Sequence, residues 1–259
     1  MAPRVFVGAG DIGWCGLPGA AATARLMDTI GGDVFTAGDN AYMSGTMQQF
    51  RDCYDPFWGR FRGRIHASPG NHEYETPGAT PYFDYFGGDA GPSGLGYYSF
   101  PLSAWHVISL NSNIGVTAGS PQGQWLRGDL AASQAKCTIA IWHHPLFTSG
   151  QNGDNPHMRE FWTMLYAAGV DIVINGHDHL YERFGLQDPE GRPDPAKGIR
   201  QFIVGSGGAS LYNFVTVRAN SEARISNYGV LKFTLETDTY RWEFIPVSGL
   251  GDSGTGTCH

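Results

Sequence analysis

The sequence predicts an α/β protein built on mixed β-sheets that are covered by helices. Short apolar runs of strand length alternate with helical segments through the first two thirds of the chain, and strands dominate the last third. That order is typical of sheets with helices packed on their faces. A second observation is the 37 glycines among 259 residues, which fall in turns and not in a repeat. They indicate many tight loops at strand ends, where binding groups usually lie.

The individual elements follow from apolar or β-branched runs bounded by glycine, proline and polar residues, with helical stretches between them. The expected strands cover residues 5–9, 34–37, 65–68, 95–100, 105–110, 138–142, 170–174, 199–204, 229–235 and 240–247. The expected helices cover residues 20–30, 47–61 with a break at Pro56, 122–132 and 158–168. The strands at 95–100 and 105–110 should form a hairpin, and residues 187–197 a surface loop.

Length, charge and cysteine content restrict the class of protein. A chain of 259 residues can bury a sizeable core, and a net charge of −7 without any basic run argues against a nucleic-acid surface. No apolar stretch is long enough for a membrane span, and no signal peptide is visible, as in a mature protein whose leader has been removed. The four cysteines lack CxxC spacing, which leaves two disulfides with three possible pairings, or four free thiols in a cytosolic protein. These cysteines are Cys15, Cys53, Cys137 and Cys258.

Polar residues of the types that bind metals follow five of the expected strands. The five endings are Asp11-Ile12-Gly13, Gly38-Asp39-Asn40-Ala41-Tyr42, Gly70-Asn71-His72-Glu73, His143-His144-Pro145 and Gly176-His177-Asp178-His179. A single aspartate before a turn is most often a cap or an Asx-turn. Because the carboxyl ends of strands in α/β proteins gather at one edge of a sheet, the five endings together predict one site.

This ordered series resembles the calcineurin-like metallophosphoesterases and, within them, the purple acid phosphatases, in particular the small secreted bacterial members. The blocks read DxG, GDxxY, GNHE, HHP and GHxHxYER, they span residues 11 to 183, and residues 205–212 add a further similar stretch. The resemblance implies a four-layer α/β/β/α sandwich of two mixed sheets flanked by helices. Residues 1–259 are expected to form a single catalytic domain, without a further N-terminal domain because the first expected strand begins at residue 5.

The resemblance implies two metal ions bridged by one carboxylate. The first ion would be held by Asp11, Asp39, Tyr42 and His179, and the second by Asp39, Asn71, His143 and His177. The first set offers up to three anionic ligands, which suit a trivalent ion such as Fe(III). The second set, with the shared carboxylate, an amide and two imidazoles, suits Zn(II), Fe(II) or Mn(II). One carboxylate can bridge ions about 3.5–4 Å apart.

Tyr42 takes the place of a ligand that this chain lacks. Most phosphodiesterases of the superfamily resembled here carry DxH in the first block, whereas this chain has Gly13 at the position of the histidine. A phenol ionises near neutral pH only beside a strong cation, and Fe(III) is one. We therefore interpret Tyr42 as a metal ligand and not as a packing residue.

Asn71, His72 and His144 are the candidate catalytic residues. His72 matches the histidine that contacts the substrate or its leaving oxygen, or else it makes a structural hydrogen bond to a carboxylate. Neighbours on an extended strand end point opposite ways, so only one of the two adjacent histidines should reach the metal. The resemblance implies that this one is His143, while His144 lines the pocket or packs. Asn152 stands where many relatives carry a histidine near the leaving group, and an asparagine cannot act as a general acid.

Two expectations concern residues around the site. Glu182 and Arg183 should form an internal ion pair that steadies the His177–His179 loop. The aromatic residues that could form pocket walls are Trp14, Tyr82, Tyr85 and Phe86.

The sequence thus predicts a secreted or periplasmic phosphatase that hydrolyses small phosphomonoesters by attack of a metal-bound hydroxide. The alternative is a phosphodiesterase or nucleotide hydrolase that uses the same two-metal site. A third possibility is a metal- or phosphate-binding protein without useful catalysis. Neither nucleic acid nor a membrane is expected as a partner, and the sequence does not define the oligomeric state.

Overall fold

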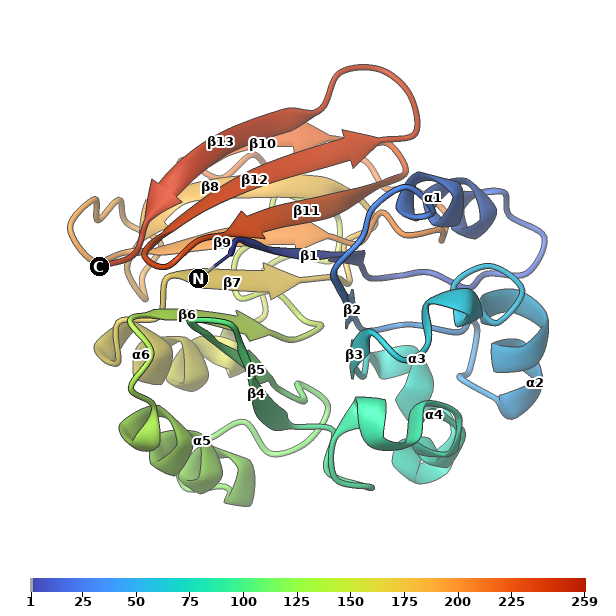
Figure 1. The fold of residues 1–259 in the computed structure, drawn as a ribbon, viewed down its shortest axis with the longest axis horizontal. Coiled ribbons are helices and arrows are strands. Elements are labelled where there is room, and N and C mark those ends of the chain that lie inside the picture. The colour runs from blue at the N-terminus through green and yellow to red at the C-terminus, as the bar shows by residue number, and fades with distance from the viewer. Residues whose placement is uncertain (1) are drawn as a thin grey trace.

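Residues 2–259 are described in the computed structural model of the protein, in which two β-sheets pack face to face (Figure 1). The first sheet has six strands in the order β13-β12-β11-β1-β2-β3. β1, β2 and β3 run parallel, and the three C-terminal strands add to them in antiparallel fashion. The bounds are Arg4–Ala9 (β1), Asp33–Ala37 (β2), Ile65–Ser68 (β3), Gly229–Leu235 (β11), Thr239–Pro246 (β12) and Asp252–Thr257 (β13).

The second sheet has seven strands in the order β10-β8-β9-β7-β6-β5-β4. β5, β6, β7 and β9 are parallel, whereas β4, β8 and β10 pair antiparallel to their neighbours. The bounds are Tyr98–Leu102 (β4), Trp105–Ser109 (β5), Cys137–Ile141 (β6), Ile172–Asn175 (β7), Tyr181–Gln187 (β8), Ile199–Val204 (β9) and Ser221–Ile225 (β10). Both sheets are therefore mixed, as the sequence predicts.

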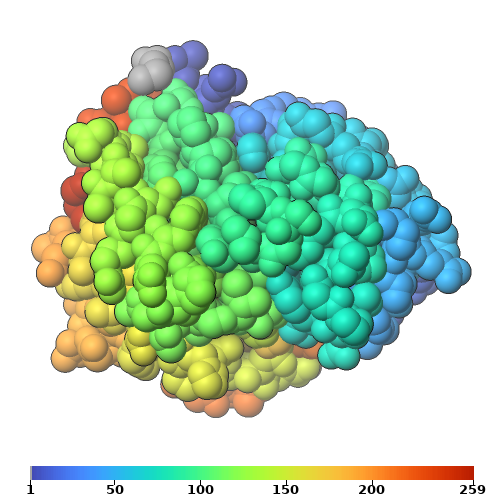
Figure 2. Space-filling view, turned by 90° about the horizontal axis from the view of Figure 1, so that it is seen from below, coloured from blue at the N-terminus to red at the C-terminus, as the bar shows by residue number. Residues whose placement is uncertain are grey.

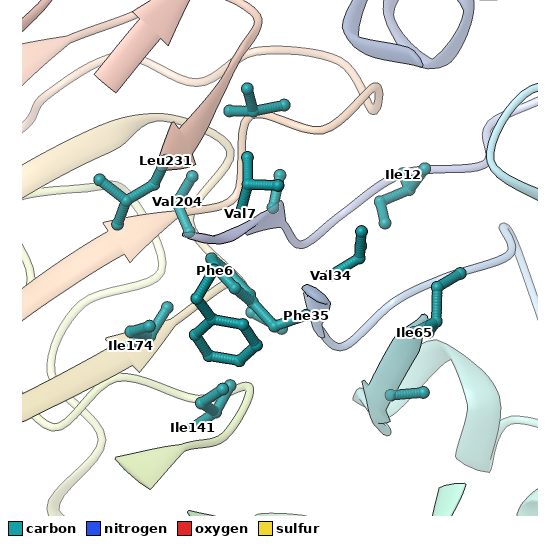
Figure 3. Close-up of a cluster of buried hydrophobic side chains, with 14 of the residues drawn as sticks. Phe6, Val7, Ile12, Val34, Phe35, Ile65, Ile141, Ile174, Val204 and Leu231 are labelled. Carbon is teal, nitrogen blue, oxygen red and sulfur yellow. The ribbon is translucent and has the colours of Figure 1, made fainter. Parts of the chain in front are cut away.

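The main core lies between the two sheets. Phe6 of β1 and Phe35 of β2 are completely buried, with ring centroids 5.0 Å apart. In Figure 3 the ring of Phe6 points toward Ile141 of β6 and Ile174 of β7, on the opposite sheet. Full burial of one such side chain contributes about 1.5–3 kcal/mol. This packing fixes the two sets of parallel strands relative to each other.

Helices cover the outer faces of both sheets. α1 (Gly19–Met27) packs on the first sheet near β11. α5 (Pro121–Ala132) and α6 (Arg159–Ala167) cover the second sheet, where a separate hydrophobic cluster includes Leu126, Trp142 and Phe161. The shorter helices α2 (Met47–Gln49), α3 (Asn71–Tyr74) and α4 (Thr80–Phe86) lie on the side of β3 (Figure 1). The result is the four-layer α/β/β/α sandwich that the sequence predicts.

Figure 2 shows the molecule from below the view of Figure 1, where residues coloured cyan to yellow form the middle of the surface. These are the segments of α4, α5 and α6 with their connecting loops. α5 begins where Ser120 accepts a hydrogen bond from the N–H of Gly123, at 3.1 Å, and has Pro121 at its first position. A side-chain cap and a proline in the first turn are common helix starts. The expected start of this helix is therefore correct to within one residue.

Several elements differ from the sequence-based expectation. The expected helix 47–61 is divided into α2, a π-helical turn at Phe50–Tyr54 and a 3₁₀ turn at Gly59–Phe61. Strands β8, β10 and β13 were not predicted. β13 reads DSGTGT and β10 reads SEARI, so neither edge strand carries an apolar run. Both strands form because a neighbouring strand supplies the hydrogen-bond partners, which an intrinsic β-propensity does not reveal.

The expected ion pair between Glu182 and Arg183 does not form. The carboxylate of Glu182 accepts hydrogen bonds from Ser149 and Ser221, while Arg183 pairs with Asp252 at 2.7 Å. Both residues lie in β8, where successive side chains point to opposite faces of the sheet.

Most of the aromatic residues expected as pocket walls belong to the core instead. Tyr82, Tyr85 and Phe86 lie on one helix, α4, and pack with Phe50 and Tyr54. A short amphipathic helix that was not recognised in the sequence explains the difference.

All four cysteines form disulfides, Cys15–Cys53 and Cys137–Cys258. The second bond joins the start of β6 to the last residues of the chain. Among residues 2–259, no helix has the length and apolar character that crossing a membrane requires.

The Cys137–Cys258 bond should contribute strongly to stability. It closes a loop between residues 121 positions apart, so the double variant Cys137→Ser/Cys258→Ser should lose about 2–5 kcal/mol of unfolding free energy. Urea denaturation of the two proteins under non-reducing conditions measures this difference. An unchanged midpoint and slope would show that the C-terminal strand is held by its sheet contacts alone.

Candidate metal centre

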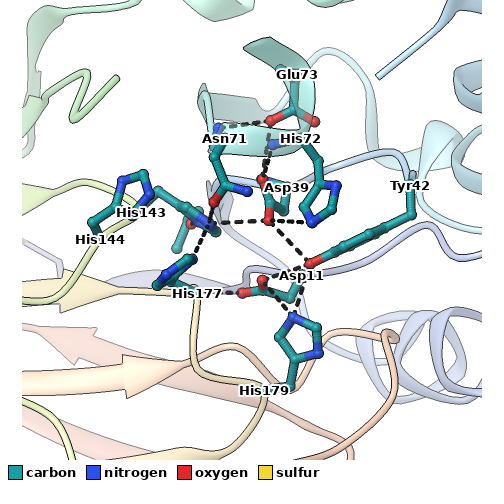
Figure 4. Close-up of polar contacts among 12 residues, drawn as sticks. Asp11, Asp39, Tyr42, Asn71, His72, Glu73, His143, His144, His177 and His179 are labelled. Atoms are coloured by element: carbon teal, nitrogen blue, oxygen red, sulfur yellow. Dashed lines mark hydrogen bonds and ion pairs between the residues drawn. The ribbon is translucent and has the colours of Figure 1, made fainter. Parts of the chain in front are cut away.

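The sequence-predicted ligands come together where parallel strands of the two sheets end. Asp11 follows β1, Asp39 follows β2 and Asn71 follows β3, all in the first sheet. His143 follows β6, and His177 and His179 follow β7, in the second sheet. Figure 4 shows these side chains pointing toward one another, with Tyr42 entering from the side of the first sheet.

One group of donor atoms surrounds the hydroxyl of Tyr42. This oxygen lies 2.7 Å from Oδ1 of Asp11, 3.2 Å from Oδ2 of Asp39 and 3.1 Å from Nε2 of His179. His179 Nε2 is also 3.2 Å from Oδ1 of Asp11. These four atoms form the first donor cluster, and they belong to the four residues that the sequence assigns to the first metal.

A second group surrounds Nε2 of His143. This nitrogen lies 3.0 Å from Oδ1 of Asn71, 3.1 Å from Oδ2 of Asp39 and 3.2 Å from Nδ1 of His177. These four atoms form the second donor cluster. Oδ2 of Asp39 belongs to both clusters. Among the donor atoms of the described residues, it is the one that could bind two ions at once.

Hydrogen bonds to the other ring nitrogen orient two of the histidines toward the clusters. Nδ1–H of His143 donates to the carbonyl of Ala37 at 2.9 Å, and Nδ1–H of His179 donates to the carbonyl of Ser210 at 2.7 Å. A carbonyl only accepts, so Nδ1 of each ring carries a proton, and Nε2 is the nitrogen that faces the cluster and would bind a metal ion. Neutral histidines anchored in this way are the usual metal ligands in proteins.

Backbone N–H groups hold the two carboxylates in the same manner. The N–H of His177 donates to Oδ2 of Asp11 at 2.8 Å, and the N–H of His72 donates to Oδ1 of Asp39 at 2.8 Å. Each carboxylate therefore keeps its other oxygen for a cluster. Asp11, Asp39 and His177 all adopt positive φ angles, of 60°, 50° and 73°, which non-glycine residues rarely adopt.

The electrostatics of the clusters favour a bound cation. Burial raises the pKa of the Asp39 carboxyl, but the facing His143 and the backbone N–H of His72 together lower it, and the net effect holds the pKa below its usual range. Burial lowers the pKa of His143, whereas Asp39 and Asp11 raise it, and the net result is about 10. Burial and then Asp11 and Asp39 raise the pKa of the Tyr42 phenol far above its usual range. A proton on His143 offsets the negative charge of these carboxylates, and a metal ion in the same position would offset it as well.

Glycines make room for this convergence. A Cβ atom at Gly70 would lie 2.1 Å from Oδ1 of Asp39, and one at Gly38, whose φ is +86°, would lie 2.5 Å from the ring of His143. Neither contact is possible for a larger residue without a backbone shift. Part of the excess of glycine in the sequence therefore serves the close packing of the donor residues.

Gly13, at the position of the missing histidine, lies beside the segment of Tyr42, its expected replacement. Gly13 pairs with the segment that carries Tyr42: its N–H donates to Asn40 at 2.9 Å and its carbonyl accepts from the N–H of Tyr42 at 3.0 Å. A Cβ at Gly13 would lie 2.6 Å from the Asn40 carbonyl. The glycine thus permits the approach that brings the phenol to Asp11.

The two further histidines border the clusters. His72 packs against the ring of Tyr42, with centroids 4.4 Å apart, and its Nε2 lies 3.8 Å from Oδ2 of Asp39. His144 does not point away from His143 as expected: its ring lies 4.4 Å from that of His177, and its Nδ1 contacts the hydroxyl of Ser112 at 2.8 Å. β6 ends at Ile141, so the alternation of a strand no longer applies at these positions.

Asn152 is bound to the loop of the second cluster. Its side-chain amide donates to the carbonyl of His177 at 2.8 Å, and its N–H donates to Asp178 at 3.1 Å. Asn152, at the position where many relatives carry a histidine, therefore binds this loop through a backbone carbonyl and a side-chain carboxylate.

Nothing in the sequence indicates that three residues, Tyr212, Trp14 and Glu73, support the donor residues. Tyr212 stacks on His179 with centroids 4.0 Å apart, and Trp14, which was expected only as a possible pocket wall, stacks on Tyr42 at 5.0 Å. Aromatic residues in loops carry no signal that tells stacking on a ligand from ordinary packing. The third missed residue, Glu73, was quoted in the GNHE block without a role.

Comparison with known proteins decides the family. The family model described as calcineurin-like phosphoesterase matches residues 5–181. The chain belongs to the calcineurin-like phosphoesterase family. The match contains every residue of the two donor clusters, from Asp11 to His179.

Among members of this family, the chain is similar to plant purple acid phosphatases. It is 30% identical to probable purple acid phosphatase 20 of Arabidopsis thaliana over 75% of this chain and 52% of that protein. It is also 30% identical to purple acid phosphatase 22 of the same organism over 80% of this chain and 50% of that protein. The chain spans about half the length of these two relatives, and 29% of the related purple acid phosphatase 15.

Solved structures confirm the fold. The purple acid phosphatase PPD1 from yellow lupin (Lupinus luteus) seeds superposes with a TM-score of 0.87 over 99% of this chain and 54% of that chain, at 22% identity. GAP50, the anchor in the inner membrane complex of Plasmodium, superposes with a TM-score of 0.73 at 16% identity, over 100% of this chain and 89% of that chain. A fold shared with an anchor does not define an activity, so function has to be argued from the donor clusters.

The two clusters can be tested separately through Asn71, which belongs to the second cluster only. Asn71→Ala should reduce the metal content from two ions per chain to one, because the first cluster keeps all four of its donors. Elemental analysis after dialysis against metal-free buffer measures the ratio. Asn227→Ala is the control, since that amide bonds only to Ser248 on the surface. A ratio that stays at two in Asn71→Ala would contradict the assignment of Asn71.

Proposed function

We propose that the protein hydrolyses phosphomonoesters at a two-metal centre formed by the two donor clusters. The observation that carries this proposal is the position of one carboxylate oxygen, Asp39 Oδ2. It lies 3.2 Å from the hydroxyl of Tyr42 and 3.1 Å from Nε2 of His143, between the clusters. A shared carboxylate of this kind suits two ions about 3.5–4 Å apart, the separation used in two-metal hydrolysis of phosphate esters. The similarity to plant purple acid phosphatases supports the same proposal, hydrolysis of phosphomonoesters.

The donor sets favour different ions. The first cluster combines two carboxylates, the oxygen of Tyr42 and one imidazole, which suits Fe(III). The second combines the shared carboxylate, the amide oxygen of Asn71 and two imidazoles, which suits Zn(II), Fe(II) or Mn(II). The pKa of His177 is lowered to about 4 by burial and by His143, so this ring is neutral and available as a ligand at ordinary pH.

When bound, the two ions would supply positive charge to the phosphate oxygens and would lower the pKa of the water that attacks phosphorus. The residues of the chain hold the donors in place, exclude bulk water from the buried carboxylates and deliver protons. Asp11, Asp39 and His143 are all at most 1% exposed. In such a site electrostatic interactions with a phosphate are much stronger than in water.

We assign proton delivery to His72. Its Nδ1–H donates to the carbonyl of Met43, so Nε2 is the one ring atom that can gain or lose a proton. This nitrogen lies 3.8 Å from Oδ2 of Asp39, and the side chain is 23% exposed, so it can also reach solvent. A histidine between solvent and the shared oxygen is suited to protonate a leaving alkoxide or phenolate.

Asn152 restricts the substrates. Its amide is directed to the carbonyl of His177, and an amide cannot donate a proton to a leaving group. With proton delivery assigned to His72, esters whose leaving groups need little protonation, such as phenols, should react best. We propose small phosphate esters as substrates, with neither nucleic acid nor a membrane as partner, in keeping with the net charge of −7.

A secreted or periplasmic location is part of the proposal. Both disulfides would persist in an oxidising compartment and are uncommon in the cytosol.

Turnover of two matched substrates tests the proposed reaction. The metal-loaded protein should hydrolyse p-nitrophenyl phosphate with a kcat/KM at least ten-fold above that for bis(p-nitrophenyl) phosphate, because a monoester offers more anionic oxygens to the two ions. Release of p-nitrophenol at a fixed metal concentration measures both rates with the same leaving group. His66→Gln, in which the altered ring lies in β3 away from the clusters, is a control for damage to the fold.

A preference for the diester would replace the phosphatase assignment by a phosphodiesterase or nucleotide hydrolase with the same donor residues. A metal-loaded protein that is inert to both esters would support a binding protein instead.

A further inference from the structure

We infer that Glu73 is a positioning residue that fixes the shared carboxylate of Asp39 relative to Asn71, and thereby sets the geometry of both donor clusters. This inference rests on the proposed two-metal centre. It concerns a residue that takes no part in either cluster: neither oxygen of Glu73 is among the donor atoms described above.

The carboxylate of Glu73 accepts four backbone hydrogen bonds. Oε1 accepts from the N–H of Asn40 at 2.7 Å and of Ala41 at 3.2 Å. Oε2 accepts from the N–H of Gly70 at 2.7 Å and of Asp39 at 3.0 Å. The side chain is completely buried, so no water competes for these donors. Figure 4 shows the carboxylate on the far side of Asp39 from His177.

These four donors belong to two different loops. Asp39, Asn40 and Ala41 follow β2, whereas Gly70 follows β3 and immediately precedes Asn71. The two strands are paired up to Ala37 and Ser68, and no strand pairing continues beyond this point. Glu73 takes over where the sheet ends: one anionic group binds the N–H groups of both loops. The distance between the shared carboxylate and the amide of Asn71 is thus set by Glu73.

Helix capping does not account for this arrangement. Glu73 is the third residue of α3, and its bond to Gly70 is the ordinary reciprocal contact of a capping box. The other three bonds reach back 34, 33 and 32 positions along the chain, to residues outside that helix. α3 consists of Asn71–Tyr74 only, and a single turn does not require a buried carboxylate.

The conformation of Asp39 explains why such an anchor is needed. Asp39 has a φ of 50°, a left-handed conformation that is unfavourable for a residue with a side chain. Its N–H donates to Glu73, and its Oδ1 accepts the N–H of His72, the residue next to Glu73. Loss of the Glu73 carboxylate would free both the backbone of Asp39 and the start of α3. Oδ2 of Asp39 would then leave the position between Tyr42 and His143.

Glu73→Gln is the decisive substitution. Glutamine has the same shape, but its amide nitrogen is a donor and would face two of the four N–H groups, so Asp39 and Gly70 or Asn40 and Ala41 lose their acceptor. Residues that orient metal ligands typically change metal affinity by about 10–100-fold when they are substituted. Because Asp39 serves both clusters, the affinity for both ions should fall, in contrast to Asn71→Ala, which affects one.

The matched control is Asp171→Asn. Asp171 is also a buried carboxylate that accepts backbone N–H groups, those of Thr138 at 2.8 Å and His259 at 3.1 Å. It precedes β7, at the opposite end of that strand from His177 and His179. Asp171→Asn should lower the thermal midpoint without changing metal affinity, and so it separates a loss of stability from a loss of positioning.

The experiment is a competition between each protein and a chelator for Zn²⁺ or Mn²⁺, with thermal unfolding of the metal-free proteins measured in parallel. We expect Glu73→Gln to bind both ions at least ten-fold more weakly than the wild type, while Asp171→Asn binds them as the wild type does. At Mn²⁺ concentrations that fill both sites, the spin-coupled electron paramagnetic resonance signal of the wild type should weaken in Glu73→Gln, because the shared oxygen is displaced. Glu73→Asp keeps the charge but has a side chain too short to reach all four donors. It should fold and show an intermediate loss, which keeps the test open if Glu73→Gln does not fold.

Wild-type affinity and an unchanged coupled signal in a folded Glu73→Gln or Glu73→Asp protein would overturn the role of Glu73 and leave the proposed function intact. A wild-type protein that binds fewer than two ions would overturn the proposed function, and the inference with it. An equal loss of affinity in Asp171→Asn would show that the effect is one of general stability, and would also overturn the inference.

Discussion

The structure depends on one constraint: two carboxylates are buried beside each other where the strands of both sheets end. Asp11 and Asp39 are 0% and 1% exposed, and a buried charge is costly unless opposite charges and hydrogen bonds balance it. The chain meets this constraint with imidazoles that face the carboxylates, with backbone N–H groups on the outer oxygens, and with donor atoms that leave positions for cations. The groups that stabilise the buried carboxylates therefore also form a site that could attract a phosphate when metal ions are bound.

The two-sheet architecture matters because neither sheet could form this site alone. The first sheet contributes carboxylates, the phenol and the amide, and the second contributes the three imidazoles of His143, His177 and His179. Packing of residues such as Phe6 against the opposite sheet keeps the two halves in register. Local devices refine the placement: Gly13 lets the segment of Tyr42 approach the loop of Asp11, and Gly70 lets the α3 loop approach Asp39. In this way the large core defines where the donors meet, and single glycines and hydrogen bonds define the distances within the site.

Much of the fold could be predicted from the sequence, and so could the meeting of the seven expected ligand side chains at one place, because each follows a recognisable apolar strand and the blocks occur in one order. The sequence also linked Gly13 and Tyr42 as a missing ligand and its expected replacement, and the structure pairs the two segments. What could not be predicted depends on contacts between distant segments. β10 and β13 form strands only because neighbours supply partners, and Arg183 pairs with Asp252 and not with its neighbour Glu182 because strand residues alternate in direction. The direction of His144 and the stacking of Trp14 and Tyr212 depend on loop conformations, for which local sequence carries little information.

The most direct test of the central claim is the visible absorption spectrum of the purified, iron-loaded protein, compared with that of Tyr42→Phe at equal metal content. The phenol oxygen of Tyr42 lies 2.7–3.2 Å from the other three donors of its cluster, so we predict a phenolate bound to Fe(III). Such a bond gives a broad charge-transfer band in the wild type, and that band should disappear in Tyr42→Phe. A band that persists unchanged in the variant would contradict the role of Tyr42. A colourless wild-type protein that holds iron at this cluster would contradict it equally.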